Sequence, residues 1–195
     1  MVFECDSPEE NLAWDDNLLA GEQEALRLWE SPVPFVVMGR SGQVEREVRL
    51  PVNIPVLRRS SGGGTVLQGP GCLNYTLVLS LTSRPILVSV ERSYTELLSA
   101  VVRTLGIGGL EVVGSDILYQ SRKISGNAQR RSRGWLLHHG TILYEPFHLA
   151  DIEHTLREPF RQPPHRQGRP HHEFLTKLPI AREELVTRLL ALAHM

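Results

Sequence analysis

The sequence is poor in several features, and each shortage excludes a class of protein. Only two cysteines, Cys5 and Cys72, occur among 195 residues. They are too few for a disulfide framework, and they lack the spacing of metal ligands. No apolar run approaches the roughly 18 residues that a membrane-spanning helix needs. The start, MVFECDSPEEN, is acidic, unlike the basic region that opens a secretory signal. These absences predict a protein of the reducing cytoplasm with no membrane partner.

Neither sign of charge dominates. The formal net charge is −1, with 21 Lys and Arg against 22 Asp and Glu, so no overall field draws the chain to nucleic acid. Arginines cluster in residues 130–133 and 157–169, and such runs are typical of a solvated surface. Lysine is scarce, because only Lys123 and Lys177 occur among the 21 cations. Arginine meets nearly every other need for a cation, which makes Lys123 a candidate functional residue.

What remains is typical of a globular protein, with 41% hydrophobic and 22% charged residues. The length predicts one domain over residues 1–195. Periodicity predicts four helices and several short strands. The predicted helices are 15–29, 93–105, 149–156 and 183–192; the predicted strands are 34–39, 73–81 and several short segments from Leu110 to Tyr144. The order of elements is not a regular βαβ alternation, so we predict an α+β fold with a mixed β-sheet flanked by helices.

Three segments carry more specific signals. Ser93 and Glu96 predict a capping box at the start of the second helix, and Gly106 lies where a C′ residue is expected. Prolines in residues 51–59 predict an extended arm at the edge of a sheet. Residues 159–174 hold too many prolines for a regular element, so we predict a loop that either closes over a ligand or is an insertion.

A run of three glycines, Gly62–Gly64, lies between extended segments in RRSSGGGTVLQGPGCLNY. Without Cβ atoms, backbone N–H groups can approach a ligand closely and form a nest around an anion. Arg58 and Arg59 come directly before the glycines, and guanidinium groups suit phosphate or carboxylate. A strand follows, so the pattern is neither a Walker A loop nor a dinucleotide fingerprint. The glycines alone fit a flexible hairpin connection; the paired arginines favour an anion-binding loop.

Lys123 lies in SRKISGN, where residues 125–127 are predicted to form a tight polar turn that can hold a polar ligand. An ammonium is a compact donor that can follow one carbonyl or phosphate oxygen. Further along, HHGT places His138 and His139 in an apolar strand. Successive strand residues point to opposite faces, so at most one of the two faces the same pocket as Lys123. No carboxylate accompanies them at a ligand spacing, and we predict no metal site there.

Taken together, these motifs resemble the lipoate–protein ligase family, part of the biotin/lipoate ligase superfamily. The matching segments are NLAWDDNLL (11–19), LRLWESPVPFVVMGR (26–40), RRSSGGGTVLQGPGCLNYTLVLSL (58–81), GSDILYQSRKISGNAQRR (114–131) and HHGTILY (138–144). The resemblance implies a two-step reaction. Lipoate and ATP give lipoyl-adenylate and pyrophosphate, and the lipoyl group then passes to a lysine of an acceptor lipoyl domain.

The resemblance also implies roles for individual residues. Lys123 is the expected catalytic residue, in contact with the acyl carbonyl and the α-phosphate. Arg59 and the backbone of residues 64–67 are expected to hold the nucleotide phosphates, with Mg²⁺ arriving on ATP. The full set expected to bind ATP or lipoyl-adenylate is Arg59, Ser61, Gly62, Gly63, Gly64, Thr65, Val66, Leu67, Asn74, Asp116, Ser125, Gly126, Asn127, His139, Gly140 and Thr141.

The chain departs from the family pattern in three places. It ends at Met195, without room for the small C-terminal domain of full-length bacterial ligases, which makes a separate accessory protein a candidate partner in the activation step. GRSGQ (39–43) displaces Gln43 from its usual spacing. QGPGC (68–72) replaces the common His-Asp-x-Gly and removes an acidic residue.

Other functions stay open from the sequence. An octanoyltransferase moves its acyl group through a cysteine thioester without ATP. No cysteine follows Lys123, so only Cys72 could serve, and a structural role for Cys72 is favoured. A biotin ligase usually shows a GRGR-x-GR phosphate loop, and this sequence has Arg58 to Gly64 instead. Outside the enzymes, the alternative is a module that binds lipoate or an acyl carrier without catalysis.

Overall fold

The computed structural model of the chain describes residues 5, 7–145 and 149–194. Most of the first six residues of the acidic start therefore lie outside the described residues. No helix among those described is long and apolar enough to cross a membrane.

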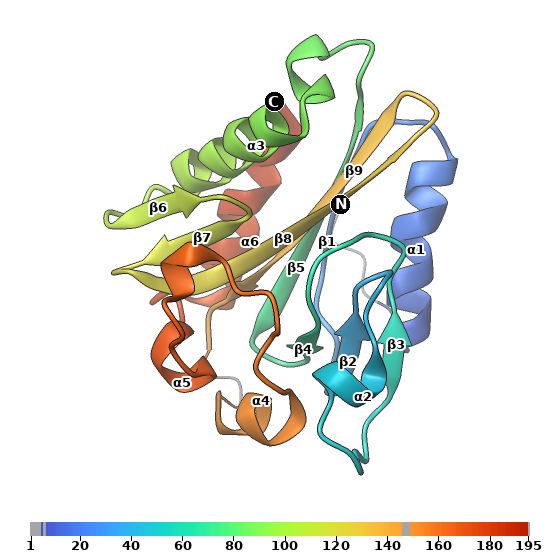
Figure 1. The fold of residues 1–195 in the computed structure, drawn as a ribbon. Helices are drawn as coiled ribbons and strands as arrows, with labels where there is room; N and C mark the ends of the chain where they lie inside the picture. The colour runs from blue at the N-terminus through green and yellow to red at the C-terminus, as the bar shows by residue number, and fades with distance from the viewer. Residues whose placement is uncertain (1–4, 6, 146–148, 195) are drawn as a thin grey trace.

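Nine strands form two sheets in the described part of the chain (Figure 1). The larger is antiparallel throughout. Its order is β1 (Ala25–Trp29), β5 (Cys72–Ser80), β9 (Trp135–Leu143), β8 (Arg122–Ser132), β7 (Asp116–Tyr119) and β6 (Leu110–Val113). The smaller has the order β3 (Val56–Arg58), β2 (Phe35–Met38) and β4 (Val66–Gln68). In it β2 pairs parallel with β3 and antiparallel with β4. The predicted α+β class is confirmed, with the mixed pairing in the small sheet.

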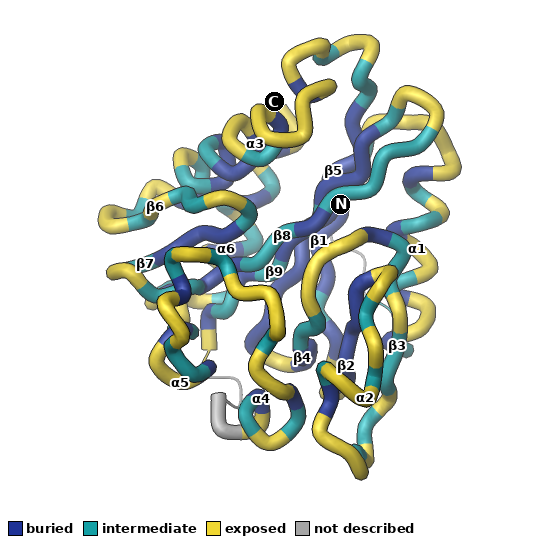
Figure 2. Tube along the Cα trace, viewed as in Figure 1, coloured by how far each residue is buried: buried dark blue, intermediate teal, exposed yellow. Residues whose placement is uncertain are grey.

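The main core lies on one face of the six-stranded sheet, which we call the core face. Alternate residues of β5, such as Leu73, Tyr75 and Leu77, pack there against α3 (Val90–Leu105) and α6 (Arg182–Leu190). The period-two pattern of residues 73–81 thus predicts the strand correctly. Figure 2 shows β5 in dark blue, as buried along most of its length.

The first predicted helix is wrong in its position. The helix α1 covers Pro8–Ala20, and residues 25–29 form strand β1 instead. The prediction followed apolar spacing, whereas the buried face of α1 carries Asn11 and Asp15. Both bind the buried Arg27 of β1, with 3.0 Å between Arg27 Nη1 and Asp15 Oδ1. A polar stripe of this kind is invisible to a hydrophobic pattern.

The second helix exists but begins earlier than predicted. It starts at Val90, and its N-cap is Ser89, whose hydroxyl accepts a hydrogen bond from Arg92 N. Ser93 is therefore not the cap. It is buried inside the helix and donates to Gln129 Oε1 at 2.9 Å. Gly106 ends the helix with a left-handed φ of 58°, as predicted.

The remaining predictions mostly hold. The segment 51–59 ends in β3, at an edge of the small sheet. The last helices are α4 (Leu149–Thr155) and α6, and the loop 159–174 contains only the short turns η2 (Pro164–Arg166) and α5 (His171–Phe174). The other short elements are α2 (Val44–Glu47), η1 (Pro85–Val88) and η3 (Ala191–His194).

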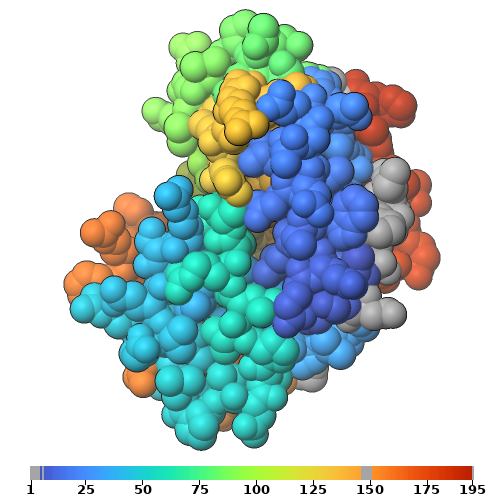
Figure 3. Space-filling model, turned by 90° about the vertical axis from the view of Figure 1, so that its right-hand side faces the viewer, coloured from blue at the N-terminus to red at the C-terminus, as the bar shows by residue number. Residues whose placement is uncertain are grey.

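The second face of the six-stranded sheet, which we call the site face, is covered differently. Helix α1 and the small sheet lie over it near β5 and β9, and the segment with α4 and α5 lies near β7 and β8 (Figure 1). Figure 3 shows α1 in dark blue beside the teal small-sheet residues, below the gold tip of the β8–β9 hairpin. This face carries polar residues such as Thr76, Asp116 and His139, beside smaller apolar clusters around Val78 and Cys72.

Candidate functional site

Lys123 reaches the site face because β8 contains a bulge. The β7–β8 register shifts between Ile117 and Leu118, which leaves Ile124 as an extra residue. In a regular strand, residues three apart point to opposite faces; the bulge brings Lys123 and Gly126 to the same face. A Cβ at Gly126 would lie 2.8 Å from Lys123 Nζ. The ammonium thus occupies the space that this glycine leaves open.

Asp116 holds the ammonium from the neighbouring strand. Its Oδ1 lies 2.9 Å from Lys123 Nζ, and its Oδ2 lies 2.9 Å from His165 Nε2. The Asp116 side chain is 6% exposed and that of Lys123 is 24% exposed, so the pair is shielded while the ammonium stays accessible. His165 comes from η2, which places the segment 159–174 directly over the site.

The glycine loop crosses the same face, two residues further along β8. A Cβ at Gly63 would lie 3.7 Å from Ala128 Cβ, so Gly63 packs over Ala128. The loop also passes close to Gly39, where any Cβ would overlap the Gly63 carbonyl oxygen. Within the described part of the chain, the N–H groups of Gly62, Gly63 and Gly64 donate no hydrogen bond. The three glycines are exposed, and unpaired amides beside a cation would suit an anionic ligand.

Arg59 holds the conformation of this loop through hydrogen bonds. Its Nη2 donates to the carbonyl oxygens of Gly62 at 2.6 Å and Gly64 at 2.8 Å, and its Nε donates to Ser61 Oγ at 3.0 Å. Burial lowers the pKa of Arg59 to about 10, and the nearby Glu47 carboxylate opposes that shift. The donors Nε and Nη2 are thus engaged with the loop itself, and Nη1 donates to Val37 O of β2 at 3.3 Å.

His139 and His138 point to opposite faces, as predicted. His139 is on the site face, where its Nε2 lies 2.6 Å from Ser61 Oγ and its Nδ1 lies 3.0 Å from Asp15 Oδ2. His138 is buried on the core face, 3.0 Å from Gln129 through Nδ1. Burial lowers the pKa of His138 to about 3, and the neighbouring His139 and Arg131 contribute less.

Thr141 and Asn74 also lie on the site face, beside Gly126. With Gln68 they close a ring of hydrogen bonds. Gln68 Nε2 donates to Thr141 Oγ1 at 2.7 Å, Thr141 Oγ1 donates to Asn74 Oδ1 at 2.8 Å, and Asn74 Nδ2 donates to Gln68 Oε1 at 3.1 Å. This ring is a rigid polar floor next to Lys123.

Three predicted site residues lie on the core face instead. The predicted turn at residues 125–127 does not exist, because these residues run within β8. Both Nδ2 protons of Asn127 are used, by Ser115 O at 2.9 Å and Ser125 Oγ at 3.1 Å, and its Oδ1 accepts from Tyr75. A Cβ at Gly140 would overlap this Asn127 side chain. Ser125, Asn127 and Gly140 therefore support the sheet from behind, away from Lys123.

The residues after the glycines enter the small sheet. Thr65 donates its hydroxyl proton to Glu47 of α2. Val66 and Leu67 pair with β2, and Leu67 packs in a buried cluster with Val36. Their side chains anchor the end of the loop and do not line the site face beside Lys123.

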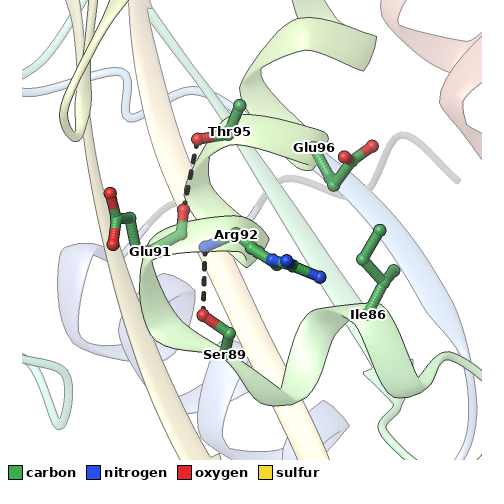
Figure 4. A pocket seen from close by; sticks show the side chains of 6 residues that line it. All are labelled: Ile86, Ser89, Glu91, Arg92, Thr95 and Glu96. Atoms are coloured by element: carbon green, nitrogen blue, oxygen red, sulfur yellow. Dashed lines mark hydrogen bonds between the residues drawn. The ribbon is translucent and has the colours of Figure 1, made fainter.

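The described residues contain no group of three or more His, Cys, Asp or Glu that could hold a metal ion. A surface pocket of about 460 Å³ lies at the start of α3, between Ile86, Glu91 and Glu96 (Figure 4). None of the predicted site residues lines it, and its charged side chains, Glu91, Arg92 and Glu96, carry one more negative than positive charge. We therefore place the candidate site on the site face, where the cation and the free amides meet.

Residue patterns missed several partners in this site. Asp15 was hidden in a segment read as an apolar helix, although it lies within NLAWDDNLL, one of the family-like segments. His165 lies in the loop 159–174, which is predicted either to close over a ligand or to be an insertion, and no role is predicted for His165 itself. Gly39 carries the clearest sequence signal, since a glycine at a buried strand often marks a close backbone approach.

The fold and site define a class: an α+β domain with a glycine loop and a nearby lysine on one face of an antiparallel sheet. The family model of the lipoyl protein ligase A/B catalytic domain matches residues 7–177. The chain belongs to this family, as the sequence predicts.

Relatives within the family carry two kinds of name. A Schizosaccharomyces pombe protein of the lipoate-protein ligase A type is 35% identical over 84% of this chain and 44% of its own length. An octanoyl-GcvH:protein N-octanoyltransferase from Kyrpidia tusciae is 32% identical over 73% of this chain and 60% of its own length. The chain thus spans about half the length of the curated relatives it matches.

Solved structures share the fold. A bipartite lipoate protein ligase from Thermoplasma acidophilum, studied with its E2 lipoyl domain, has a TM-score of 0.77 at 23% identity, over 97% of this chain and 79% of its own. A lipoate-protein ligase A bound with ATP has a TM-score of 0.73 at 22% identity, over 97% of this chain and 81% of its own. These likenesses confirm the predicted ligase-type fold.

Proposed function

We propose that this chain activates lipoate with ATP and transfers the lipoyl group from lipoyl-adenylate to a lysine of an acceptor lipoyl domain. The observation that carries the proposal is the shared position of Lys123 and the Gly62–Gly64 loop on the site face. The ammonium lies over Gly126 and the loop over Ala128, two residues along one strand. In the proposal, residues 1–195 act as one catalytic domain.

The glycine loop and Lys123 have different roles toward ATP and the acyl-adenylate. Free amides of the glycine loop hold the nucleotide phosphates, and Arg59 holds the loop in shape through its carbonyl contacts. Lys123 contacts the acyl carbonyl and the α-phosphate, where negative charge develops as the mixed anhydride forms and breaks. Asp116 and His139 flank this position on the same face.

The choice of substrates is supported by structures of the same fold, one bound with ATP and one studied with an E2 lipoyl domain. Mg²⁺ would arrive with ATP and be held mainly by its phosphates. The site fits that role better than a protein-built cage, because the Asp116 carboxylate is already engaged by Lys123 and His165. The proposal includes a separate small accessory protein for activation, a division for which the bipartite ligase is the precedent.

Pyrophosphate release tests the first step. The purified chain is incubated with ATP·Mg²⁺ and lipoate, octanoate or biotin, with and without an accessory protein of the C-terminal-domain type. Lipoate-dependent release, followed by a lipoyl mass increase on the acceptor domain, is the expected result. Tight binding of lipoyl-adenylate without any turnover would instead favour a non-catalytic binding module.

An octanoyltransferase is the second candidate, since the Kyrpidia tusciae relative carries that name. Its thioester route needs a reactive cysteine, but Cys72 is fully buried, and burial raises the pKa of its thiol. We expect Cys72→Ala to retain acyl transfer. Transfer from an octanoyl carrier without ATP that is lost in Cys72→Ala would favour this second function.

A further inference from the structure

A chain of hydrogen bonds links helix α1 to the glycine loop through His139. Asp15 Oδ2 lies 3.0 Å from His139 Nδ1, and His139 Nε2 lies 2.6 Å from Ser61 Oγ. Arg59 Nε then donates to Ser61 Oγ at 3.0 Å. The order of partners, carboxylate to imidazole to hydroxyl, is that of the Ser–His–Asp arrangements which move protons in acyl-transfer enzymes.

The partners fix the direction of each hydrogen bond. Asp15 Oδ1 accepts from Arg27 Nη1 at 3.0 Å and from Thr76 Oγ1 at 2.9 Å. A carboxylate held by a buried arginine is an acceptor only, so His139 Nδ1 carries its proton toward Asp15. In the neutral ring, Nε2 then has the lone pair and accepts from the Ser61 hydroxyl. Ser61 Oγ accepts from Arg59 and keeps one lone pair for a further donor.

The hydrogen-bonded chain Asp15–His139–Ser61, called the relay below, is largely buried and lies among charged groups. Asp15 is 4% exposed and Ser61 is 1% exposed, whereas the His139 side chain is 15% exposed. The charged groups around it are Arg27 from β1, Arg59 from the glycine loop and the Asp16–Arg130 pair, which spans 2.9 Å between α1 and β8. The adjacent His138 is on the opposite face and stays neutral, because burial lowers its pKa to about 3.

The relay ends next to the acyl position of the proposed reaction. His139 pairs with Ala128 across β8 and β9, and Lys123 lies over Gly126, the neighbouring position on the same face. These two β8 positions are about 7 Å apart along the strand. If the Lys123 ammonium binds the acyl carbonyl oxygen of lipoyl-adenylate, an acceptor amine that contacts Ser61 can therefore reach the acyl carbon.

We propose that His139, oriented by Asp15, is the base that accepts the proton of the acceptor lysine through the Ser61 hydroxyl. The inference rests on the proposed function and concerns its second step. The neutral amine nitrogen attacks the acyl carbon, the bond from that carbon to the phosphate oxygen breaks, and AMP leaves. The surplus proton on nitrogen passes to Ser61 Oγ as the Ser61 proton passes to His139 Nε2.

Access to Ser61 requires a small movement of its neighbours. The hydroxyl is covered, but the glycines that follow it are exposed, and a Cβ at Gly62 or Gly64 would meet no atom within 4 Å. The three glycines themselves can change conformation at little steric cost, whereas the Arg59 contacts to the carbonyl oxygens of Gly62 and Gly64 must loosen. The loop can therefore uncover Ser61 as ligand enters, while the His139–Asp15 pair stays fixed on the sheet.

The test uses preformed lipoyl-adenylate at saturation, an acceptor lipoyl domain and single-turnover measurement of transfer across pH. Wild-type transfer should rise with pH along a limb that is missing in His139→Gln, which can still hydrogen-bond Ser61 but cannot accept a proton. The rate of His139→Gln should fall by about 100- to 10,000-fold, the usual range for a general base. Ser61→Ala should lose transfer similarly, and His194→Gln, at an exposed histidine, should behave as wild type.

A second variant tests the orientation of the ring. In Asp15→Asn the amide can donate to Nδ1, which turns the lone pair of Nε2 into an N–H and blocks the relay. Asp15→Asn also removes the negative charge that partners the buried Arg27, so circular dichroism is used to check that this variant folds. If Asp15→Asn unfolds, the test depends on His139→Gln. Equal transfer with an unchanged pH limb in His139→Gln would overturn the relay. An acyl group found on Ser61 would also overturn it, in favour of an acyl-serine route.

Failure of the proposed function gives a different result. If the wild-type chain does not transfer the lipoyl group from supplied lipoyl-adenylate, the proposed reaction itself is wrong, and the relay falls with it. If the wild type transfers normally but His139→Gln does too, only the relay is wrong.

Discussion

Among the residues that the structure describes, the ammonium of Lys123 pairs with Asp116 alone, with 2.9 Å between Nζ and Oδ1. An ammonium has three donors, so this contact leaves donors for a ligand. The second Asp116 oxygen is taken by His165 at 2.9 Å, which keeps the carboxylate from wrapping around the ammonium. Asp116 therefore orients the ammonium of Lys123 while leaving part of its hydrogen-bonding capacity free for a ligand.

Replacing Lys123 by arginine should abolish acyl transfer while the fold stays intact. The ammonium lies in the space over Gly126, and a broad guanidinium cannot take the same position against a carbonyl oxygen. Loss of one preorganised donor of this kind typically lowers a rate about 100- to 1,000-fold. Lipoylation of the acceptor domain, followed by mass spectrometry, measures the effect.

The other lysine supplies the control for this change. Lys177 is exposed, so Lys177→Arg should leave both stability and lipoylation as in wild type. Near-normal lipoylation by Lys123→Arg would refute the role of the ammonium.

A methyl group at Gly126 should lower activity without unfolding the protein. The added Cβ would lie 2.8 Å from Lys123 Nζ and 2.9 Å from its Cε, so the flexible end of the lysine must move away from Asp116. Alanine is tolerated in a strand, and the free energy of unfolding should stay within about 1 kcal/mol of wild type. Denaturant unfolding and the lipoylation rate together separate these two effects.

Gly108→Ala is the matched control, because a Cβ there meets no atom within 4 Å. It should change neither measurement. Full activity in Gly126→Ala would mean that the observed position of the ammonium over this glycine is not needed.

Removing the His165 side chain should impair catalysis in a way that glutamine restores. In His165→Ala, Asp116 loses one of its two partners and can turn both oxygens toward Lys123, which tightens its hold on the ammonium. A hydrogen bond to a charged group contributes about 1.5–3 kcal/mol, so a loss of roughly tenfold or more in kcat is expected. His165→Gln can still donate to Asp116 and should recover most of it. A purely structural role for the segment would show no such recovery.

How far the sequence predicted this site depends on whether each signal is local. The strand β5 and the end of α3 at Gly106 follow from patterns within a few residues, and both are correct. Lys123 and the glycine run were also recognisable, since an unusual residue type or a backbone without Cβ atoms is visible in one short segment. These features needed no knowledge of the partner strands.

The parts that failed depend on contacts between distant segments. Helix α1 buries Asp15 because Arg27, on another element, binds it; no periodicity reveals such a pair. The orientation of Lys123 depends on a bulge at Ile124, which reverses the face of every residue before it. Asn127 was expected beside Lys123 from a predicted turn at 125–127 and from the resemblance, but these residues run within β8 and Asn127 lies on the opposite face.

The buried His138 should make the protein less stable in mild acid. Burial lowers the pKa of His138 from its ordinary value of 6.5 to about 3, so between these values the unfolded chain binds a proton that the folded chain does not. Stability therefore falls as pH decreases from about 6.5 toward 3, by up to about 1.4 kcal/mol per pH unit. Between pH 7 and pH 5 the loss due to this group is about 2 kcal/mol.

Comparison with His138→Gln isolates this contribution. Glutamine can still accept from Gln129, which lies 3.0 Å from His138 Nδ1, but it does not titrate in this range. Urea unfolding at pH 7 and pH 5 should therefore show a smaller acid loss in the variant than in wild type, by about 2 kcal/mol. His194→Gln, at an exposed position, should show the wild-type loss. An identical loss in wild type and His138→Gln would mean that His138 takes up its proton in the folded state. The burial of His138 argues against this, because its ring centroid lies 5.9 Å from that of Tyr75 and 5.8 Å from that of Tyr94.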